Sequence, residues 1–197
     1  MGAHESMEHA EHAHHASHSD NKRIALLIAL LALFLALSET MGKSAQTDAL
    51  SQNIEASNLW AFFQAKTVRM TVVRTAAENL DIELQKEADA AFKATAGKRV
   101  ESWRATEKRY DDEPETNEGR KQLVVRAKKA EEKRDLALAR YHHYEMASAA
   151  FQIGIVLASA TIITGMVLLS WGAIALAVIG VGFTAIGLFA PHAVHLL

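Results

Sequence analysis

The histidines are the residues of this chain best suited to binding a metal ion. Six of the ten lie within the first 18 residues, among three glutamates: His4, His9, His12, His14, His15 and His18. In a helix, His14 and His18 would share a face, as would His12 and His15. Neutral imidazoles spaced in this way can bind Zn²⁺, Ni²⁺ or Cu²⁺. The alternative is a polar tail that binds metals weakly and without a role.

A second group of ionisable residues is the segment YHHYE at residues 141–145. It is either a metal or proton site or an interfacial belt of aromatic rings and histidines at lipid headgroup level, and we favour the belt. Glu39 follows an apolar run, where solvation at the interface is a simpler explanation than an ion path. Beyond residue 145 the ionisable side chains are His192 and His195, which argues against a proton-driven transporter formed by this chain alone.

Enzymatic chemistry has little support in the sequence. The chain has no cysteine, so disulfides and thiolate chemistry are absent, and a formal net charge of −2 offers no basic field for nucleic acid. Phosphate-binding loops, dinucleotide fingerprints, zinc-protease motifs and nucleophile elbows do not occur. We therefore expect a protein that is not an enzyme, with no catalytic residue and no cofactor apart from the candidate metal at the tail.

The elements that would position these residues follow from an uneven distribution of charge. The 197 residues have a mean hydropathy of +0.01, but residues 24–38 and 146–197 hold no Asp, Glu, Lys or Arg. Residues 39–145 hold 19 acidic and 19 basic residues. A charged segment between two apolar ones excludes a single water-soluble globule and indicates a membrane protein.

The apolar segments divide the chain into a membrane anchor, a stalk and a membrane hairpin. The run IALLIALLALFLAL at 24–37 covers roughly 21 Å as a helix, so it needs flanking residues to cross a core of about 30 Å. It also resembles a signal peptide, but we favour an uncleaved anchor. We expect a turn at Trp171-Gly172. The expected parts are a His-rich tail at 1–21, spans at 22–42, 147–170 and 173–190, a stalk at 43–146, and a C-terminal tail at 191–197.

The stalk is expected to be an antiparallel helical hairpin, which makes the chain an all-α membrane protein. Between Lys43 and Ala96 there is no proline or glycine, and Gly97 is the first plausible apex. A helix from about Lys98 to Asp112, a turn at DDEPETNEG and a helix capped by Thr116 or Asn117 complete it. An apolar stripe advances by three or four residues through Leu50, Ile54, Ser57, Ala61, Ala65, Val68, Val72, Ala76 and Leu80.

Three further patterns indicate helix packing. A heptad seam continues from the stalk into the second span without a helix breaker, through Leu123, Ala127, Ala130, Arg134, Ala137, Tyr141, Tyr144, Ser148, Phe151 and Ile155. Small residues line one face of each C-terminal span, at Gly154, Ala158, Thr161, Gly165, Gly180, Thr184 and Gly187. The aromatic patch of Trp60, Phe62 and Phe63 is interpreted as core, although it could dock a partner. The heptad seam and the small residues of the spans serve packing within the chain, contact between subunits, or both.

The distribution of basic residues indicates which side of the membrane holds the stalk. Seven Lys and Arg residues lie at the stalk ends of the first two spans, against Lys22 and Arg23 on the other side. That bias favours a cytoplasmic stalk. The first span taken alone favours the opposite orientation.

Several stretches resemble a known bacterial membrane-protein family. They are the histidine tail, NKRIALLIALLALFLALSETMGKSAQT, NIEASNLWAFFQAKTVRMTVVRTAAE, EGRKQLVVRAKKAEEKRD and YHHYEMASAAFQIGIVLASATIITG. The family is called domain of unknown function 4337. The resemblance implies a bacterial inner-membrane protein with three spans. It implies no catalytic or binding residue.

The leading functional hypothesis is a membrane scaffold or accessory subunit without enzymatic activity. It would form homo-oligomers or join a larger membrane complex through its stalk and its small-residue spans. The competing hypothesis is a metal-handling or ion-conducting protein that uses the histidine tail or an oligomeric pore. The expected partners are the lipid bilayer and protein, not nucleic acid.

Overall fold

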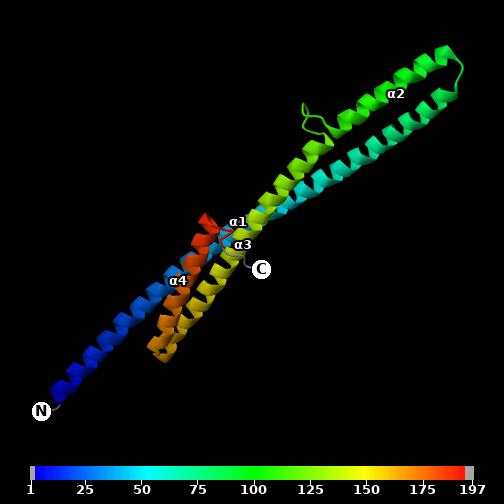
Figure 1. Cartoon of the computed structure of the whole chain (residues 1–197). Coiled ribbons are helices and arrows are strands. Elements are labelled where there is room, and N and C mark those ends of the chain that lie inside the picture. The colour runs from blue at the N-terminus through cyan, green and yellow to red at the C-terminus, as the bar shows by residue number, and fades with distance from the viewer. Residues whose placement is uncertain (1–2, 194–197) are drawn as a thin grey trace. The chain divides into compact units, whose positions relative to one another are not determined.

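The computed structural model describes the backbone of residues 3–193 and the side chains of residues 21–193 (Figure 1). This part of the chain forms four α-helices and no strand. They are α1 (Ala3–Lys86), α2 (Ala90–Asp111), α3 (Arg120–Thr164) and α4 (Val167–Phe189). The all-α prediction is therefore confirmed, as is the unbroken helix that enters the second apolar segment.

Three of these helices are long and apolar enough to cross a membrane, judged by length and composition. They are α3, α4 and the part of α1 that begins at Asn21. The 23 residues of α4 would extend about 34 Å, which exceeds a hydrocarbon core of about 30 Å. These helices match the number of spans expected from the sequence.

The chain divides into two compact units. The apolar unit comprises Met1–Asp48 and Leu136–Leu197, and the hairpin unit comprises Ala49–Asp135. Each unit has its own core of buried side chains.

The hairpin unit is antiparallel, as predicted. Figure 1 shows α2 beside the C-terminal part of α1. Arg104 near the middle of α2 pairs with Asp81 of α1. Farther from the turn, the indole Nε1 of Trp60 donates to Glu131 of α3 at 2.8 Å. Residues late in α1 thus meet residues early in the returning helices.

The apex predicted at Gly97 is wrong, because the turn lies at residues 87–89. There the carboxylate of Asp89 accepts a hydrogen bond from the backbone N of Ala91 at 2.8 Å and caps α2. Gly97 lies inside α2 with open space around it. A single glycine costs a helix only about 1 kcal/mol, which neighbouring residues can offset.

The second turn of the hairpin unit lies where the sequence placed it, but its helix begins later. Residues 112–119 separate α2 from α3. The caps predicted at Thr116 and Asn117 are wrong, since α3 begins at Arg120. Asn117 instead adopts a positive φ of 58° within the turn, a conformation that asparagine tolerates better than most residues.

In the apolar unit, the turn predicted at Trp171-Gly172 is also displaced. The chain turns at Gly165-Met166, where Gly165 has a φ of +70° and ends α3 as a left-handed C-terminal residue. Trp171 and Gly172 lie inside α4. A Cβ atom on Gly172 would lie 3.2 Å from Leu157, so this glycine permits close packing of α3 and α4.

Helix α1 buries a different face in the hairpin unit from the one its apolar stripe suggested. Four residues of that stripe, Leu50, Ile54, Val68 and Val72, are 52–63 % exposed. The buried positions of α1 include Ala49, Ala56, Met70 and Ala77, which are separated by multiples of seven residues. The three alanines let the returning helices approach closely, whereas the bulkier stripe points outward.

The seam on α3 is covered within the chain. In the hairpin unit, Leu123, Ala127 and Ala130 form one core with Ala56 and Leu59. In the apolar unit, Phe151 forms a second core with Leu31 and Ala147. Of the remaining predicted seam and small-residue positions, those buried are Ala137, Tyr144, Gly154 and Ala158, those partly buried are Tyr141 and Ile155, and Gly165 is exposed.

This arrangement predicts a large difference between two substitutions on α3. Leu123→Ala removes a side chain with no exposed surface and should lower the free energy of unfolding by about 2–5 kcal/mol. Val125→Ala is the matched control, since Val125 is 67 % exposed, and should change it by less than about 0.5 kcal/mol. Thermal unfolding of the full chain in mild detergent measures both. Equal effects would contradict the packing of α3 described here.

Candidate functional site

The histidines proposed as metal ligands lie outside the residues whose side chains the structure describes. They are His4, His9, His12, His14, His15 and His18. Over residues 21–193, no group of three or more His, Cys, Asp or Glu side chains is arranged to hold a metal ion. The tail metal site therefore stays a prediction from the sequence.

The two histidines of the YHHYE segment have different environments in the apolar unit. His143 is buried, its Nε2 lies 3.1 Å from the carbonyl oxygen of Pro191, and its ring stacks on Phe183. Its Nδ1 has no hydrogen-bond partner among the described residues. His142 is half-exposed, with Nδ1 3.8 Å from a carboxylate oxygen of Glu145. His143 thus packs α3 against α4, and His142 faces outward.

A cavity of about 360 Å³ lies between α1 and α3 in the apolar unit. Polar and aromatic residues line it: Ser38, Glu39, Lys43, Gln46, Tyr141, Tyr144, Glu145 and Ser148. Gly42 also lines it, where a Cβ would lie 3.6 Å from that of Tyr144. A smaller, mainly apolar cavity of about 300 Å³ lies beside Leu27, Thr161 and Ile174.

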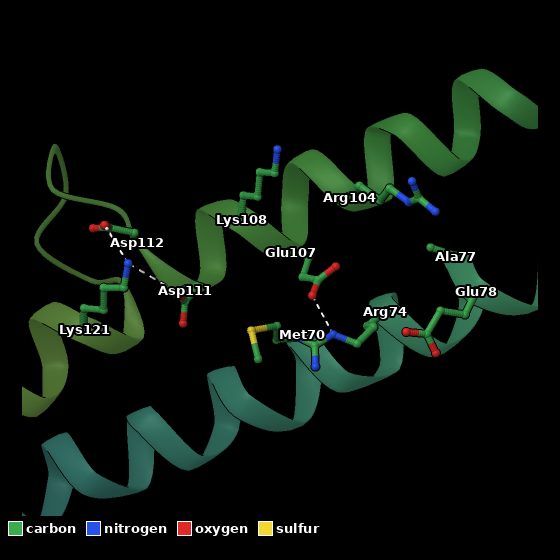
Figure 2. A pocket seen from close by; sticks show the side chains of 10 residues that line it. All are labelled: Met70, Arg74, Ala77, Glu78, Arg104, Glu107, Lys108, Asp111, Asp112 and Lys121. Atoms are coloured by element: carbon green, nitrogen blue, oxygen red, sulfur yellow. Dashed lines mark hydrogen bonds and ion pairs between the residues drawn. The ribbon is translucent and has the colours of Figure 1, made fainter. Parts of the chain in front are cut away.

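A third cavity, of about 700 Å³, is an open groove in the hairpin unit between α1, α2 and the start of α3 (Figure 2). Four basic and four acidic residues line it: Arg74, Arg104, Lys108, Lys121, Glu78, Glu107, Asp111 and Asp112. Met70 and Ala77 form its apolar part. The charges balance, so the groove favours neither a cationic nor an anionic ligand.

Several of these charges are already paired with one another. Figure 2 shows Arg74 of α1 pointing toward Glu107 of α2, and the Nε atom donates to the carboxylate at 2.6 Å. Lys121 donates to Asp112 at 3.1 Å. Hydrogen bonds from Gln122 and Lys121 lower the pKa of Asp112. These pairs connect the three helices across the groove, and they offer no nucleophile beside a general base.

A buried lysine is the most unusual charged group in the hairpin unit. Lys66 is 5 % exposed, and its Nζ donates to Glu113 at 3.0 Å. The ammonium also lies 5.4 Å from the ring centre of Phe62 and 5.8 Å from that of Tyr110, within the range of cation–π attraction. The contact fixes the 112–119 turn against α1, because a buried ammonium needs its carboxylate partner.

The aromatic patch packs against the core, which confirms its interpretation as core, and its Phe62 ring lies beside Lys66. Trp60, Phe62 and Phe63 pack against the buried cluster of the hairpin unit. The guanidinium of Arg120 lies 5.0 Å from the ring centre of Phe63. Neither Lys66 nor Glu113 was predicted from the sequence. The one sequence signal for Lys66 is that it follows Leu59, another buried position of α1, by seven residues.

Fold and cavities together define a class: an all-helical protein with three helices apolar enough to cross a membrane and a charged helical hairpin. Within that class, the chain belongs to the family described as Domain of unknown function (DUF4337), whose sequence model matches residues 20–190. This match confirms the resemblance seen in the sequence. No curated protein and no solved structure matches the chain.

The contact between Glu113 and Lys66 predicts a dependence of stability on pH. The hydrogen bond from Lys66 lowers the pKa of Glu113 from its ordinary value of 4.5. The contact should therefore stabilise the hairpin unit fully above about pH 4.5 and lose its effect as the pH falls through the lowered pKa. Glu113→Gln should destabilise the chain at pH 7, and this destabilisation should shrink as the pH falls below about 4.5.

Thermal unfolding of the full chain, followed by circular dichroism between pH 7 and pH 3, measures this difference. Glu115→Gln is the control, because Glu115 is an exposed residue of the same turn. A gap between the Glu113→Gln variant and the parent chain that did not narrow on acidification would contradict the role of the ion pair.

Proposed function

We propose that this protein is an integral membrane scaffold or accessory subunit without enzymatic activity. Its spans are residues 22–42 of α1, the apolar end of α3 from residue 147, and α4. The hairpin unit lies outside the bilayer and binds other copies of the chain or a larger membrane complex.

One observation carries the membrane placement: large apolar side chains cover the outer surface of the apolar unit. Soluble proteins rarely expose such continuous apolar surface, whereas lipid covers it without cost. The exposed side chains come from all three helices and include Leu26, Leu30, Leu33, Leu37, Ile153, Val156, Ile163, Val178 and Ile179. Close packing at Gly154, Gly172 and Gly180 on the inner faces is typical of helices that associate in lipid.

The outer face of α1 in the hairpin unit supports the scaffold role. The N-terminal half of the exposed stripe defined by Leu50, Ile54, Val68 and Val72 is flanked mainly by uncharged residues, whereas Arg69 and Arg74 flank the other half. Residues 49–65 contain one charged side chain, Glu55. Depletion of charge around exposed apolar side chains is typical of the centre of a protein interface. This stripe replaces the α3 seam as the proposed contact surface, because the seam is covered within the chain.

The proposed orientation places the hairpin unit in the cytoplasm of a bacterial cell, following the excess of basic residues beside the spans. The chain has no cysteine, so single cysteines can report their side of the membrane. In spheroplasts, a membrane-impermeant maleimide should label Asn21→Cys at once and Ser102→Cys only after permeabilisation. The reverse pattern would contradict the orientation, and release of the chain by alkaline carbonate would contradict membrane insertion.

Self-association through the exposed stripe can be tested in the same background. Val68→Cys should form covalent dimers with a short bis-maleimide in native membranes. Ser102→Cys, exposed on α2, is the control and should form few. Replacing Val68 and Val72 together by glutamate should weaken the oligomer at least tenfold, about 1.4 kcal/mol, as measured by native mass spectrometry. Unchanged oligomers, or a bare monomer without a co-purifying partner in the parent chain, would refute the proposed role.

A further inference from the structure

The cavity between α1 and α3 lies where both helices change from apolar to charged sequence. On α1, the uncharged run ends at Ser38, and Glu39 and Lys43 line the cavity. On α3, Tyr144 and Glu145 line it just before the uncharged segment begins at residue 146. If the apolar unit is inserted as proposed above, this cavity lies at the level of the lipid headgroups.

The inner part of the cavity contains an unpartnered hydroxyl group. Ser148 is 8 % exposed, and its Oγ has no hydrogen-bond partner within residues 21–193. Ser38, which also lines the cavity, is 1 % exposed, and its Oγ lies within hydrogen-bond distance of Thr184 Oγ1, at 3.1 Å. Buried polar groups are nearly always hydrogen-bonded. Among the described residues, the Ser148 hydroxyl is therefore an unpaired polar group in the lining of the cavity.

The outer part of the cavity carries charges of both signs. Glu39 and Glu145 contribute carboxylates. Glu39 accepts a hydrogen bond from Gln152 at 3.3 Å, and Glu145 lies 3.5 Å from the phenol of Tyr141 and 3.8 Å from His142 Nδ1. Lys43 contributes an ammonium that pairs with no carboxylate among the described residues. Carboxylates beside two tyrosine rings suit an organic ammonium group. An unpaired lysine suits a phosphate.

We propose that this cavity binds the headgroup of a zwitterionic phospholipid, such as phosphatidylethanolamine. The ammonium end lies among Glu39, Glu145 and the tyrosine rings, and the phosphate lies beside Lys43. The acyl chains leave toward the apolar faces of α1 and α3. A volume of about 360 Å³ accommodates such a headgroup. The two carboxylates disfavour anionic lipids, so the site discriminates by headgroup charge.

Native mass spectrometry of the full chain in mild detergent tests the preference. The protein is mixed with equal amounts of phosphatidylethanolamine and phosphatidylglycerol that have identical acyl chains. The parent chain should retain at least fivefold more phosphatidylethanolamine. Glu145→Gln and Lys43→Gln should each reduce this retention at least fivefold. The controls Glu132→Gln and Lys129→Gln replace exposed charges of α3 outside the cavity and should leave it unchanged.

Equal retention of the two lipids by the parent chain, or retention that neither cavity substitution reduces, would overturn the proposal. The source of the headgroup is tested by adding soluble phosphoethanolamine in tenfold excess over lipid. Persistent lipid binding supports a lipid ligand, and displacement would overturn it in favour of a soluble one. All replaced side chains are exposed, so the variants should fold, and circular dichroism verifies this.

This inference rests on the proposed membrane insertion, and the two can fail separately. A chain that leaves the membrane without detergent contradicts the insertion itself. A chain that needs detergent but shows no headgroup preference contradicts only the lipid site.

Discussion

Close contact between long helices, made possible by small residues at regular spacing, is the constraint on which both units depend. In the hairpin unit, alanines 49, 56 and 77 of α1 recur at multiples of seven, and Leu123 is fully buried against this surface. In the apolar unit, a Cβ on Gly180 would lie 2.6 Å from the ring of Phe151. Bulkier residues at these positions would separate the helices and expose the few large side chains that fill each core.

The polar contacts then fix the order in which the helices pack. Trp60 reaches Glu131, and Lys66 reaches Glu113, so α1 and the returning helices are held in one register. Most other ion pairs of the hairpin unit are exposed, where each contributes little. The buried lysine differs, because leaving its charge without a partner would be costly. Lys66 therefore favours this helix register, because any other register would leave its buried charge without a carboxylate partner.

How far the sequence could predict the fold depended on the kind of signal. The lack of charged residues identified the apolar helices. Pro114 and its polar neighbours indicated the turn at residues 112–119. Isolated glycines were poor guides, since Gly97 and Gly172 lie inside helices and the helix end is at Gly165. A glycine ends a helix only where a turn lets the following segment pack favourably against the rest of the chain. The local sequence does not show whether that packing is available. The same limit hid the exposed cavity charges Glu39, Lys43 and Glu145, which are neighbours only after α1 meets α3.

The helical class, the three apolar segments and the family could be predicted from the amino-acid sequence, because they depend on composition and local periodicity. Which face of each helix is buried depends on how the helices pack, and local periodicity does not contain that information. Helix α1 carries two stripes at helical spacing, and periodicity alone favoured the more apolar one, through Leu50 and Val72. The structure buries the other stripe, because its small side chains let α2 and α3 approach α1 closely. The same face also places Lys66 beside its partner Glu113. The apolar stripe is left outside, where it forms the proposed surface for a second chain.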